Sequence, residues 1–310
     1  MNSRFRVFLY EKMHSQGIRL LEEKCNVAYA QSLDPEYLLE QTRDVDGIII
    51  RANGAVTRPI IESASRLKVI GRHGVGVESV DLVAAKEHGI AVVYTPAANT
   101  QSVAEHFIAL ALMLAKKLRL GDIALRAGNW KARYELVGTE LCGKTLGIVG
   151  FGRIGQQTAR TCHMSFEMPV LYYDVVAYPE MEMELGAKAI DLKQLFAEAD
   201  FISINLPLVP QTRGLINSDL LKLMKPTAFL INMARGPVWN ESDVVKALKE
   251  NWIAGAGSDV YEVEPAPSDN PLFALNNFVG TPHMAAHTEE SLIRMSVTVS
   301  CDVLAVLEGR

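Results

Sequence analysis

Three glycines at fixed spacing constrain the fold most. Gly150, Gly152 and Gly155 follow the β-rich run Thr145–Val149 and open a helical pattern. In a strand–turn–helix of this kind, the first glycine permits the tight turn and the second lets the backbone approach a pyrophosphate. The third lets the helix pack close to the strand. Free amides and the helix dipole attract phosphates at such a helix start. The spacing therefore predicts a dinucleotide-binding βαβ unit.

An acidic residue, Asp174, stands at the end of the next β-rich run, nineteen residues after Gly155. A carboxylate there accepts hydrogen bonds from the adenine-ribose hydroxyls and repels a 2′-phosphate, which favours NAD over NADP. The alternative is a glycine-rich turn without a ligand and a solvent-facing aspartate. Because strand, loop, helix and acid are all in register, we favour the nucleotide interpretation.

β-rich runs alternate with helical patterns along most of the chain, which predicts an α/β fold with largely parallel sheets. The alternation breaks at Thr95-Pro96. An apolar helix is expected next, over Ser102–Lys117, and a helix of this kind is usually buried. Polar, irregular chain is expected from Arg119 to Gly143. A loop of that length must pack against something, so we expect an arm that crosses to a second subunit. A second α/β series starts at Lys144.

The composition excludes several classes. A chain of 310 residues suggests about two domains. The net charge of −5 argues against a general nucleic-acid binder. Four scattered cysteines without a CxxC pair indicate reduced thiols. No signal-peptide core is evident, and the longest apolar run, Phe107–Ala115, is too short to span a bilayer. We therefore expect no membrane partner and a cytoplasmic location.

Three ionisable residues, Arg235, Glu264 and His283, each follow a β-rich run of the second series. Ligands of open α/β sheets bind beyond the carboxyl ends of the strands. Hydride transfer between NAD and a hydroxyl-bearing carbon also moves a proton, and histidine is its usual carrier. A carboxylate orients the histidine, and an arginine holds a substrate carboxylate. From spacing alone, a packed or surface histidine and a solvated glutamate beside Pro265 remain open alternatives.

A second glycine cluster, Gly71-Arg-His-Gly-Val-Gly76, also follows a β-rich run but lacks the third glycine of the fingerprint. Its backbone amides and Arg72 suit an anion, and a tight turn without a ligand is the alternative. His283 and His287 are spaced for a metal pair on one helix face. Pro282 places His283 at the start of the helical pattern and no third ligand is evident, so we expect no metal.

Six segments carry a family resemblance that extends over nearly all of the chain. They are Gly71-Arg-His-Gly-Val-Gly-Val, Leu146-Gly-Ile-Val-Gly-Phe-Gly-Arg-Ile-Gly, Leu206-Pro-Leu-Val-Pro-Gln-Thr-Arg-Gly-Leu-Ile-Asn, Ile231-Asn-Met-Ala-Arg-Gly, Asp259-Val-Tyr-Glu-Val-Glu-Pro and Thr281-Pro-His-Met-Ala-Ala-His-Thr. The sequence resembles the D-isomer-specific 2-hydroxyacid dehydrogenase family, most closely its phosphoglycerate-dehydrogenase-like branch.

The resemblance implies two doubly wound parallel-sheet domains, Rossmann-like and flavodoxin-like, with a cleft between them. Residues 1–98 and 286–310 would form a discontinuous substrate-binding domain. Residues 99–285 would form the NAD-binding Rossmann domain, with a dimerisation helix and arm at about residues 102–142. A homodimer is expected.

The resemblance also implies roles for individual residues. The catalytic set would be Arg235, Glu264 and His283. The cofactor-binding residues would be Gly150, Gly152, Arg153, Ile154, Gly155, Asp174, Pro207, Thr212, Ala234, Asp259 and His283, with Asp259 on the nicotinamide amide. The substrate-binding residues would be Arg51, Arg72, Gly74, Val75 and Arg235.

The implied activity is NAD-dependent interconversion of a D-2-hydroxyacid and its 2-oxoacid, foremost 3-phosphoglycerate and 3-phosphohydroxypyruvate. Alternatives are a hydroxypyruvate or glyoxylate reductase, a sulfolactate-type dehydrogenase, and an NAD-binding transcriptional corepressor without significant turnover. Arg133 would correspond to a basic residue offered across the dimer, and surface ion pairs are the alternative for Arg51 and Arg133. The pattern departs at Pro237, Trp239 and Asn240, which replace smaller residues and an acid after the catalytic arginine.

Overall fold

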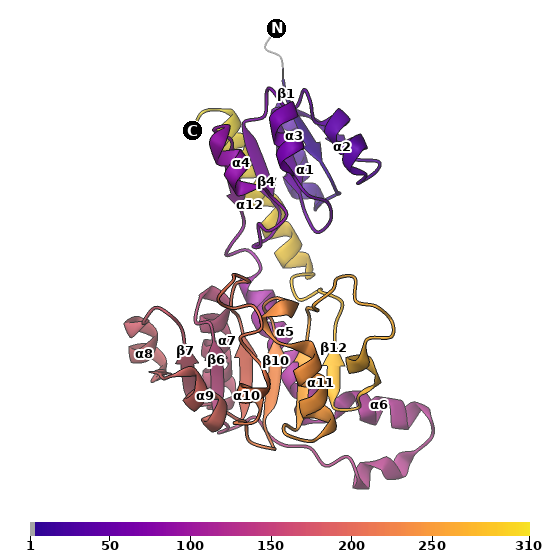
Figure 1. Cartoon of the computed structure of the whole chain (residues 1–310), viewed down its shortest axis with the longest axis vertical. Coiled ribbons are helices and arrows are strands. Elements are labelled where there is room, and N and C mark those ends of the chain that lie inside the picture. Colours follow the sequence, from indigo (N-terminus) through magenta and orange to yellow (C-terminus); the bar gives the residue numbers. More distant parts are fainter. Residues whose placement is uncertain (1–3) are drawn as a thin grey trace. The chain divides into compact units, whose positions relative to one another are not determined.

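The computed structural model describes residues 4–310 and divides the chain into two compact units. Unit 1 runs to Asn99 and takes up the chain again over Ala286–Arg310, while unit 2 comprises Thr100–Ala285. Figure 1 shows that the yellow C-terminal helix belongs to the same unit as the indigo N-terminal strands. The fold is α/β, and both sheets are wholly parallel.

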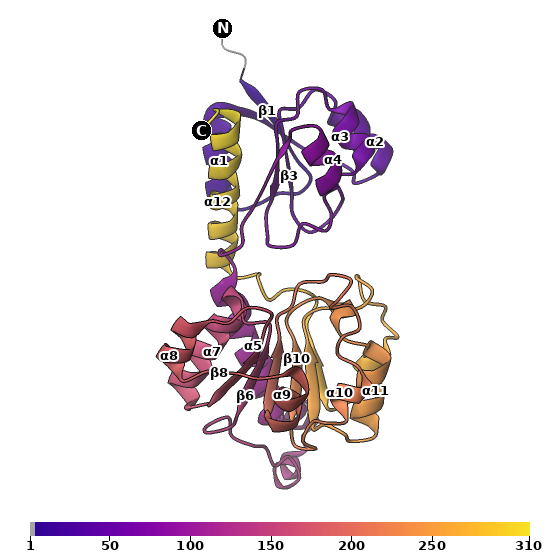
Figure 2. The same cartoon turned by 60° about the vertical axis from the view of Figure 1, so that its left-hand side comes forward.

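Unit 1 is built on a five-stranded sheet in the order β2-β1-β3-β4-β5. The strands are β1 (Phe5–Leu9), β2 (Cys25–Tyr29), β3 (Gly47–Ile50), β4 (Val69–Arg72) and β5 (Ala91–Tyr94). The helices are α1 (Ser15–Lys24), α2 (Pro35–Gln41), α3 (Arg58–Ser63), α4 (Leu82–Glu87) and α12 (Glu289–Leu307). Figure 2 shows α1 and α12 on one side of this sheet and α2, α3 and α4 on the other. Two apolar cores, one on each side, bury both faces of the sheet.

Close approach fixes α12 against its neighbours in unit 1. A Cβ on Gly71 of β4 would lie 2.8 Å from methyl carbons of Val299 and Val303, both on α12. A side chain on Gly17 of α1 would likewise overlap the α12 residue Ser296. The two glycines therefore let the last helix of the chain pack directly on β4 and α1, completing the core that the N-terminal segment begins.

Unit 2 is built on a seven-stranded sheet in the order β12-β11-β10-β9-β6-β7-β8. The strands are β6 (Leu146–Val149), β7 (Val170–Tyr173), β8 (Lys188–Ala189), β9 (Phe201–Ile204), β10 (Phe229–Asn232), β11 (Gly255–Ser258) and β12 (Phe278–Gly280). The α-helices are α5 (Thr100–Ala115), α6 (Leu118–Arg126), α7 (Arg153–Phe166), α8 (Pro179–Leu185), α9 (Leu192–Glu198), α10 (Ser218–Leu221) and α11 (Glu241–Lys249). Three 3₁₀ turns complete it: η1 (Trp130–Tyr134), η2 (Gly236–Val238) and η3 (Pro271–Ala274).

Helix α5 is buried within unit 2, where it packs on β10, β11, β12 and α7. Strand β11 carries glycines where Leu114 of α5 approaches, because a Cβ on Gly255 would lie 3.2 Å from its Cδ2. Small residues on the strand thus match the apolar helix above it. The other face of the sheet is covered by α9, α10 and α11 over a second apolar core.

The segment after α5 differs from its sequence-based expectation. Irregular chain was expected from Arg119 to Gly143, but the structure has helix α6 and turn η1 there. The expectation was wrong because three charged residues and Gly121 make these nine residues look like polar chain, although the apolar side chains of α6 gather on one face and none of them is buried. We call residues 118–142 the arm.

Candidate active site

The carboxyl ends of β6, β9, β10, β11 and β12 lie along one edge of the unit 2 sheet, because all these strands are parallel neighbours. The loops that follow these strands carry the nucleotide glycines, Thr212, Arg235, Glu264 and His283. Five separate stretches of sequence are thereby brought to one place, where ligands of such sheets bind.

The glycine loop between β6 and α7 has the shape that its spacing predicts. Gly150 adopts φ +93°, a left-handed conformation that residues with a Cβ rarely take. A Cβ on Gly155 would overlap the Gly150 carbonyl and lie 2.9 Å from Ile148, so α7 packs hard against the loop. At Gly152, by contrast, nothing lies within 4 Å of an added Cβ. The backbone at Gly152 is therefore open on its Cβ side, and the first amides of α7, from Arg153 and Ile154 onward, are donors without partners in the helix, as a phosphate site requires.

Asp174 follows β7 and lies beside the glycine loop. Its Oδ2 accepts a hydrogen bond of 2.6 Å from the Phe151 amide, and its Oδ1 accepts one of 3.2 Å from the Val176 amide. Phe151 is buried and stacks on Tyr172, with ring centroids 4.2 Å apart. Asp174 thus joins the end of β7 to the loop after β6. Its side chain is half-buried and still reaches solvent.

The remaining loops close the edge around the glycines. The Thr212 hydroxyl donates a hydrogen bond of 2.6 Å to the Pro207 carbonyl and accepts one of 2.9 Å from the Val209 amide, which folds the loop after β9 back on itself. After β10, the Ala234 amide donates to Asn232 Oδ1 at 3.0 Å, and Ala234 is buried. These loops set the walls of the nucleotide edge.

Glu264 and His283 are in direct contact. Their Oε2 and Nδ1 atoms are 2.7 Å apart, and Glu264 Oε1 accepts a hydrogen bond of 3.0 Å from the Tyr261 amide. Burial alone would raise the pKa of Glu264, but the hydrogen bonds from His283 and the Tyr261 amide, with the charges of His283 and Arg235, lower it overall. Glu264 therefore stays ionised, and it orients the His283 ring so that Nε2 is directed away from the carboxylate.

Arg235 begins η2, directly after the β10 loop. Its guanidinium donates a hydrogen bond of 2.8 Å to the Ala234 carbonyl, which holds the side chain near the strand end. Its charge reaches Glu264, as the lowered pKa of that carboxyl records. The structure therefore brings the arginine, the glutamate and the histidine of the sequence prediction to one edge of the sheet.

Asp259 follows β11 and is almost fully buried. Its Oδ1 accepts hydrogen bonds from the Thr281 hydroxyl at 2.6 Å and the Met284 amide at 2.8 Å, and its Oδ2 accepts one from the Ala285 amide at 2.8 Å. A carboxylate offers about four acceptor positions, so Oδ2 has one left for another donor. Sequence reasoning missed Thr281 and the α5 residue His106, whose Nε2 lies 2.8 Å from the Thr281 hydroxyl. The one signal that the sequence offered for Thr281 was its position two residues before His283.

Unit 1 contains the second glycine cluster at the carboxyl end of β4, and the carboxyl end of β3 lies beside it because the two strands are parallel neighbours. Arg72 folds back over its own loop, donating to the Gly76 and His73 carbonyls at 2.7 and 2.8 Å. The Gly74 amide donates to Thr95 Oγ1 at 3.0 Å and is therefore committed within the unit.

Two amides of this loop remain available for an anion. Among residues 4–310, no hydrogen bond is found for the Val75 and Gly76 amides, and both residues are half-buried. Arg51 follows β3, and the hydrogen bond found for its side chain within the described residues is a long one of 3.4 Å to the Lys12 carbonyl. The charges of Arg51 and Arg72 both act on His73 and help to lower its pKa, so the loop carries a positive potential.

The residues that depart from the family pattern have structural contacts of their own. Trp239 is fully buried in the unit 2 core, the Pro237 carbonyl accepts a hydrogen bond from the Gly214 amide, and Asn240 caps α11. Arg133, in η1, stacks its guanidinium 5.1 Å from the Tyr134 ring centroid. No group of three His, Cys, Asp or Glu side chains suited to a metal ion occurs within the described part of the chain.

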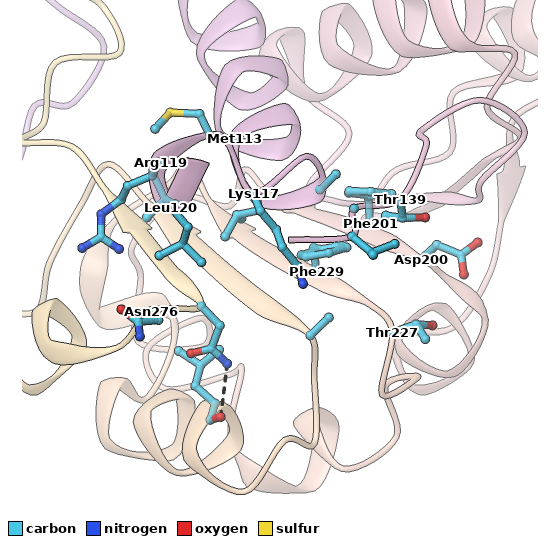
Figure 3. Close-up of a pocket in the computed structure, with 18 of the residues that line it drawn as sticks. Met113, Lys117, Arg119, Leu120, Thr139, Asp200, Phe201, Thr227, Phe229 and Asn276 are labelled. Atoms are coloured by element: carbon cyan, nitrogen blue, oxygen red, sulfur yellow. Dashed lines mark hydrogen bonds between the residues drawn. The ribbon is translucent and has the colours of Figure 1, made fainter. Parts of the chain in front are cut away.

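A cavity of about 650 Å³ lies at the opposite end of the unit 2 sheet. Figure 3 shows Lys117 beside Phe201 and Phe229, with Met113 of α5 and Leu120 of the arm farther from them around the same cavity. These phenylalanines are the first residues of β9 and β10, whereas the candidate active site follows the last residues of the same strands. The cavity is therefore separate from the active site.

The fold and the loop geometry define a dinucleotide-binding oxidoreductase of the α/β class. The family model described as "D-isomer specific 2-hydroxyacid dehydrogenase, NAD binding domain" matches residues 108–285. The chain belongs to this family, and NAD is its cofactor. It is an NAD-dependent 2-hydroxyacid dehydrogenase. No helix in residues 4–310 combines the length and the apolar character needed to cross a bilayer.

Relatives with different substrates resemble the chain to similar degrees. D-3-phosphoglycerate dehydrogenase from Methanocaldococcus jannaschii is 41% identical over 305 residues, covering 98% of this chain and 58% of that protein. Glyoxylate reductase from Pyrococcus furiosus is 39% identical over 313 residues, covering 98% of this chain and 93% of that protein. The crystal structure of the TT0316 protein from Thermus thermophilus superposes with a TM-score of 0.91 at 36% identity, covering 99% of this chain and 98% of that one.

Proposed function

We propose that the enzyme interconverts a D-2-hydroxyacid bearing a second anionic group, foremost 3-phosphoglycerate, and the corresponding 2-oxoacid. The observation that carries the substrate class is the unit 1 loop, where Arg51, Arg72 and the free amides of Val75 and Gly76 supply positive potential and donors. Backbone amides in such a loop bind anions. The net charge of −5 opposes an anionic substrate, so its attraction must come from local groups of this kind.

The reaction chemistry is proposed for the Arg235, Glu264 and His283 set. When bound, NAD supplies a hydride acceptor for C2 of the hydroxyacid. His283 takes the hydroxyl proton on Nε2, because its Nδ1 is held by Glu264. Glu264 stabilises the imidazolium that forms, and Arg235 binds the α-carboxylate through its guanidinium fork. In the reverse direction the same histidine returns the proton to the 2-oxoacid.

The cofactor roles follow the nucleotide edge of unit 2. Gly150, Gly152, Arg153, Ile154 and Gly155 would hold the pyrophosphate, and Asp174 the adenine ribose. Pro207, Thr212 and Ala234 would line the dinucleotide, and the remaining acceptor position on Asp259 would take the nicotinamide amide. The open space at Gly152 and the unused position on Asp259 Oδ2 both support this assignment.

A panel of 2-oxoacids tests the substrate. NADH oxidation is measured with 3-phosphohydroxypyruvate, hydroxypyruvate, glyoxylate, pyruvate and 3-sulfopyruvate. We expect the dianions to give the highest kcat/KM. Arg51→Gln should lower kcat/KM for 3-phosphohydroxypyruvate by about tenfold or more, since a hydrogen bond to a charged group is lost, with little change for glyoxylate. Arg19→Gln, an exposed arginine on α1, is the matched control.

Other results would select another function. Equal or better turnover of glyoxylate and hydroxypyruvate, with Arg51→Gln without effect, would favour a glyoxylate or hydroxypyruvate reductase, as the relative from Pyrococcus furiosus suggests. Tight NADH binding without turnover of any of the five would favour a corepressor-like role.

We also propose a homodimer formed through the arm. Large apolar side chains of the arm are exposed, and α6 buries none of its residues. The exposed apolar side chains of the arm are those of Leu118, Ile123, Leu125, Trp130, Tyr134 and Val137. An apolar surface of this extent is typical of an interaction site, and a second copy of the chain would cover it.

The four free thiols, two of them buried, support a reducing location such as the cytoplasm.

A further inference from the structure

A buried hydrogen-bonded chain links helix α5 to the loop that carries His283. His106, in the middle of α5, lies 2.8 Å from the Thr281 hydroxyl, and Thr281 in turn donates to Asp259 Oδ1 at 2.6 Å. The His106 side chain is only 17% exposed and that of Asp259 3%. Thr281 thus contacts Asp259, the proposed ligand of the nicotinamide amide, and His106 Nε2 lies 3.7 Å from the same carboxylate. The proposed mechanism assigns no role to His106 or to Thr281.

The proton positions along this chain follow from the chemistry of the groups. An ionised carboxylate has no proton, so the single hydroxyl proton of Thr281 points to Asp259. The Thr281 oxygen can then only accept, and His106 must donate to it from Nε2–H. Burial lowers the pKa of His106 against the opposing charge of Asp259, so the ring is neutral near pH 7 and carries its one proton on Nε2. Donation in series strengthens each hydrogen bond of the chain.

The Asp259 end of this hydrogen-bonded series fixes the backbone around His283. Asp259 also accepts from the amides of Met284 and Ala285, the two residues that follow His283. His283 itself has φ +49°, a left-handed conformation that is unfavourable for a residue with a Cβ. Such a conformation persists only where the surrounding contacts hold it. Because α5 is buried against β10, β11 and β12, it holds the His106 end of the hydrogen-bonded series rigidly.

We propose that His106 is a positioning residue, which acts through Thr281 and Asp259 to hold the His283 loop in its productive conformation. The inference rests on the proposed role of His283 as the acid–base group. His106 touches no reacting atom, so its loss should affect the placement of His283 and leave the binding of the 2-oxoacid unchanged.

Three variants and a control test the proposal by NADH oxidation with the 2-oxoacid that the wild type turns over fastest. His106→Leu removes the donor and should lower kcat about tenfold while changing KM little, since about one net hydrogen bond is lost. His106→Gln retains an N–H donor and should restore kcat to within about threefold of the wild type. Thr281→Val should match His106→Leu. His163→Leu, which removes another half-buried histidine of unit 2, should leave kcat unchanged.

Two comparisons separate positioning from a loss of stability. The double variant His106→Leu with Thr281→Val should be no slower than either single variant, because both break one chain. Rates are expressed per NADH-binding site, titrated by fluorescence, so that unfolded protein does not count. Additive effects in the double variant, or His106→Gln as slow as His106→Leu, would overturn the proposal.

A last variant distinguishes this inference from the proposed function. If His283→Ala abolishes turnover but His106→Leu is as fast as the wild type, the positioning role is wrong and the proposed function stands. If His283→Ala keeps the wild-type rate, the acid–base assignment fails, and the positioning role fails with it.

Discussion

Glu264 supplies the negative charge that faces the His283 ring, and its lowered pKa keeps that charge in place. Glu264→Gln keeps the shape of the side chain but cannot stabilise an imidazolium. We expect kcat to fall about 10²-fold or more, within the range of acid–base catalysis, while NADH affinity is unchanged. Glu262→Gln, an exposed neighbour in the same loop, is the control. A variant within twofold of the wild type in steady-state turnover would contradict the role of Glu264.

His73 makes a separate prediction about stability and pH. It is 3% exposed, and neither ring nitrogen has a partner within residues 4–310. Burial, with the charges of Arg51 and Arg72, lowers its pKa from 6.5 to about 4. The folded state therefore keeps His73 neutral, while the unfolded chain takes up a proton below its ordinary pKa. Stability is full above pH 6.5 and falls by roughly 3 kcal/mol as the pH drops toward 4.

His73→Leu removes this titration. We expect the Tm of the wild type to fall more than that of the variant between pH 7.5 and pH 5, as followed by calorimetry. The loss should lie in the transition of unit 1, which contains His73. An equal fall in both proteins would rule out a buried neutral His73.

The sequence predicted which residues lie together after the strand ends. It did not predict the contacts of residues that pack against segments distant in the chain. Arg235, Glu264 and His283 lie on one sheet edge because parallel strands force their ends together. The positions of His106 and His73 depend on packing between segments far apart in the chain. His106 sits within an apolar helix, where the pattern indicates only burial. The hydrogen bond to Thr281, 175 residues away, has no signal in the sequence.

The β-rich run at Thr145–Val149 corresponds to β6 (Leu146–Val149), and such runs are visible in the sequence because they are nearly continuous and apolar, as expected of strands buried on both faces. Strand β8 was missed because it has two residues, both exposed. Helix α6 was missed because three charged residues and Gly121 within its nine residues obscure its apolar face. Elements that bury side chains within the chain are easier to predict from the sequence than elements that bury none.

The loop after β6 acts as one element with Asp174, which yields a prediction about cofactor choice. Asp174→Ala should weaken NADH binding and relax discrimination against NADPH, because it removes both the charge and the acceptor of the Phe151 amide. Asp174→Asn keeps an acceptor for that amide. It should therefore cost less NADH affinity than Asp174→Ala while relaxing discrimination similarly. Fluorescence titration with both cofactors measures this, and an unchanged ratio of the two Kd values in Asp174→Ala would disprove the role.

At the scale of the whole molecule, the chain leaves unit 1 after Asn99 and returns to it at Ala286. The final helix then packs on β4 and α1, so unit 1 cannot be complete until the last residues of the chain are in place. Unit 2, in contrast, is formed from one continuous stretch. The arm projects from unit 2 with an exposed apolar surface that neither unit's core uses.

The exposure of the arm predicts the oligomeric state. If a second copy covers it, the protein should sediment with twice the 34.1 kDa mass of one chain. Introducing charges through Leu125→Asp with Trp130→Asp should dissociate the dimer at micromolar concentration, because each charge would have to be buried without a partner. Met183→Asp is the matched control, since Met183 is 88% exposed on α8, outside the arm. A wild-type monomer, or an arm variant that remains dimeric, would place the interface elsewhere or exclude it. If Arg133 reaches the site of the partner, the dissociated variant should also lose turnover with dianionic 2-oxoacids more than with glyoxylate.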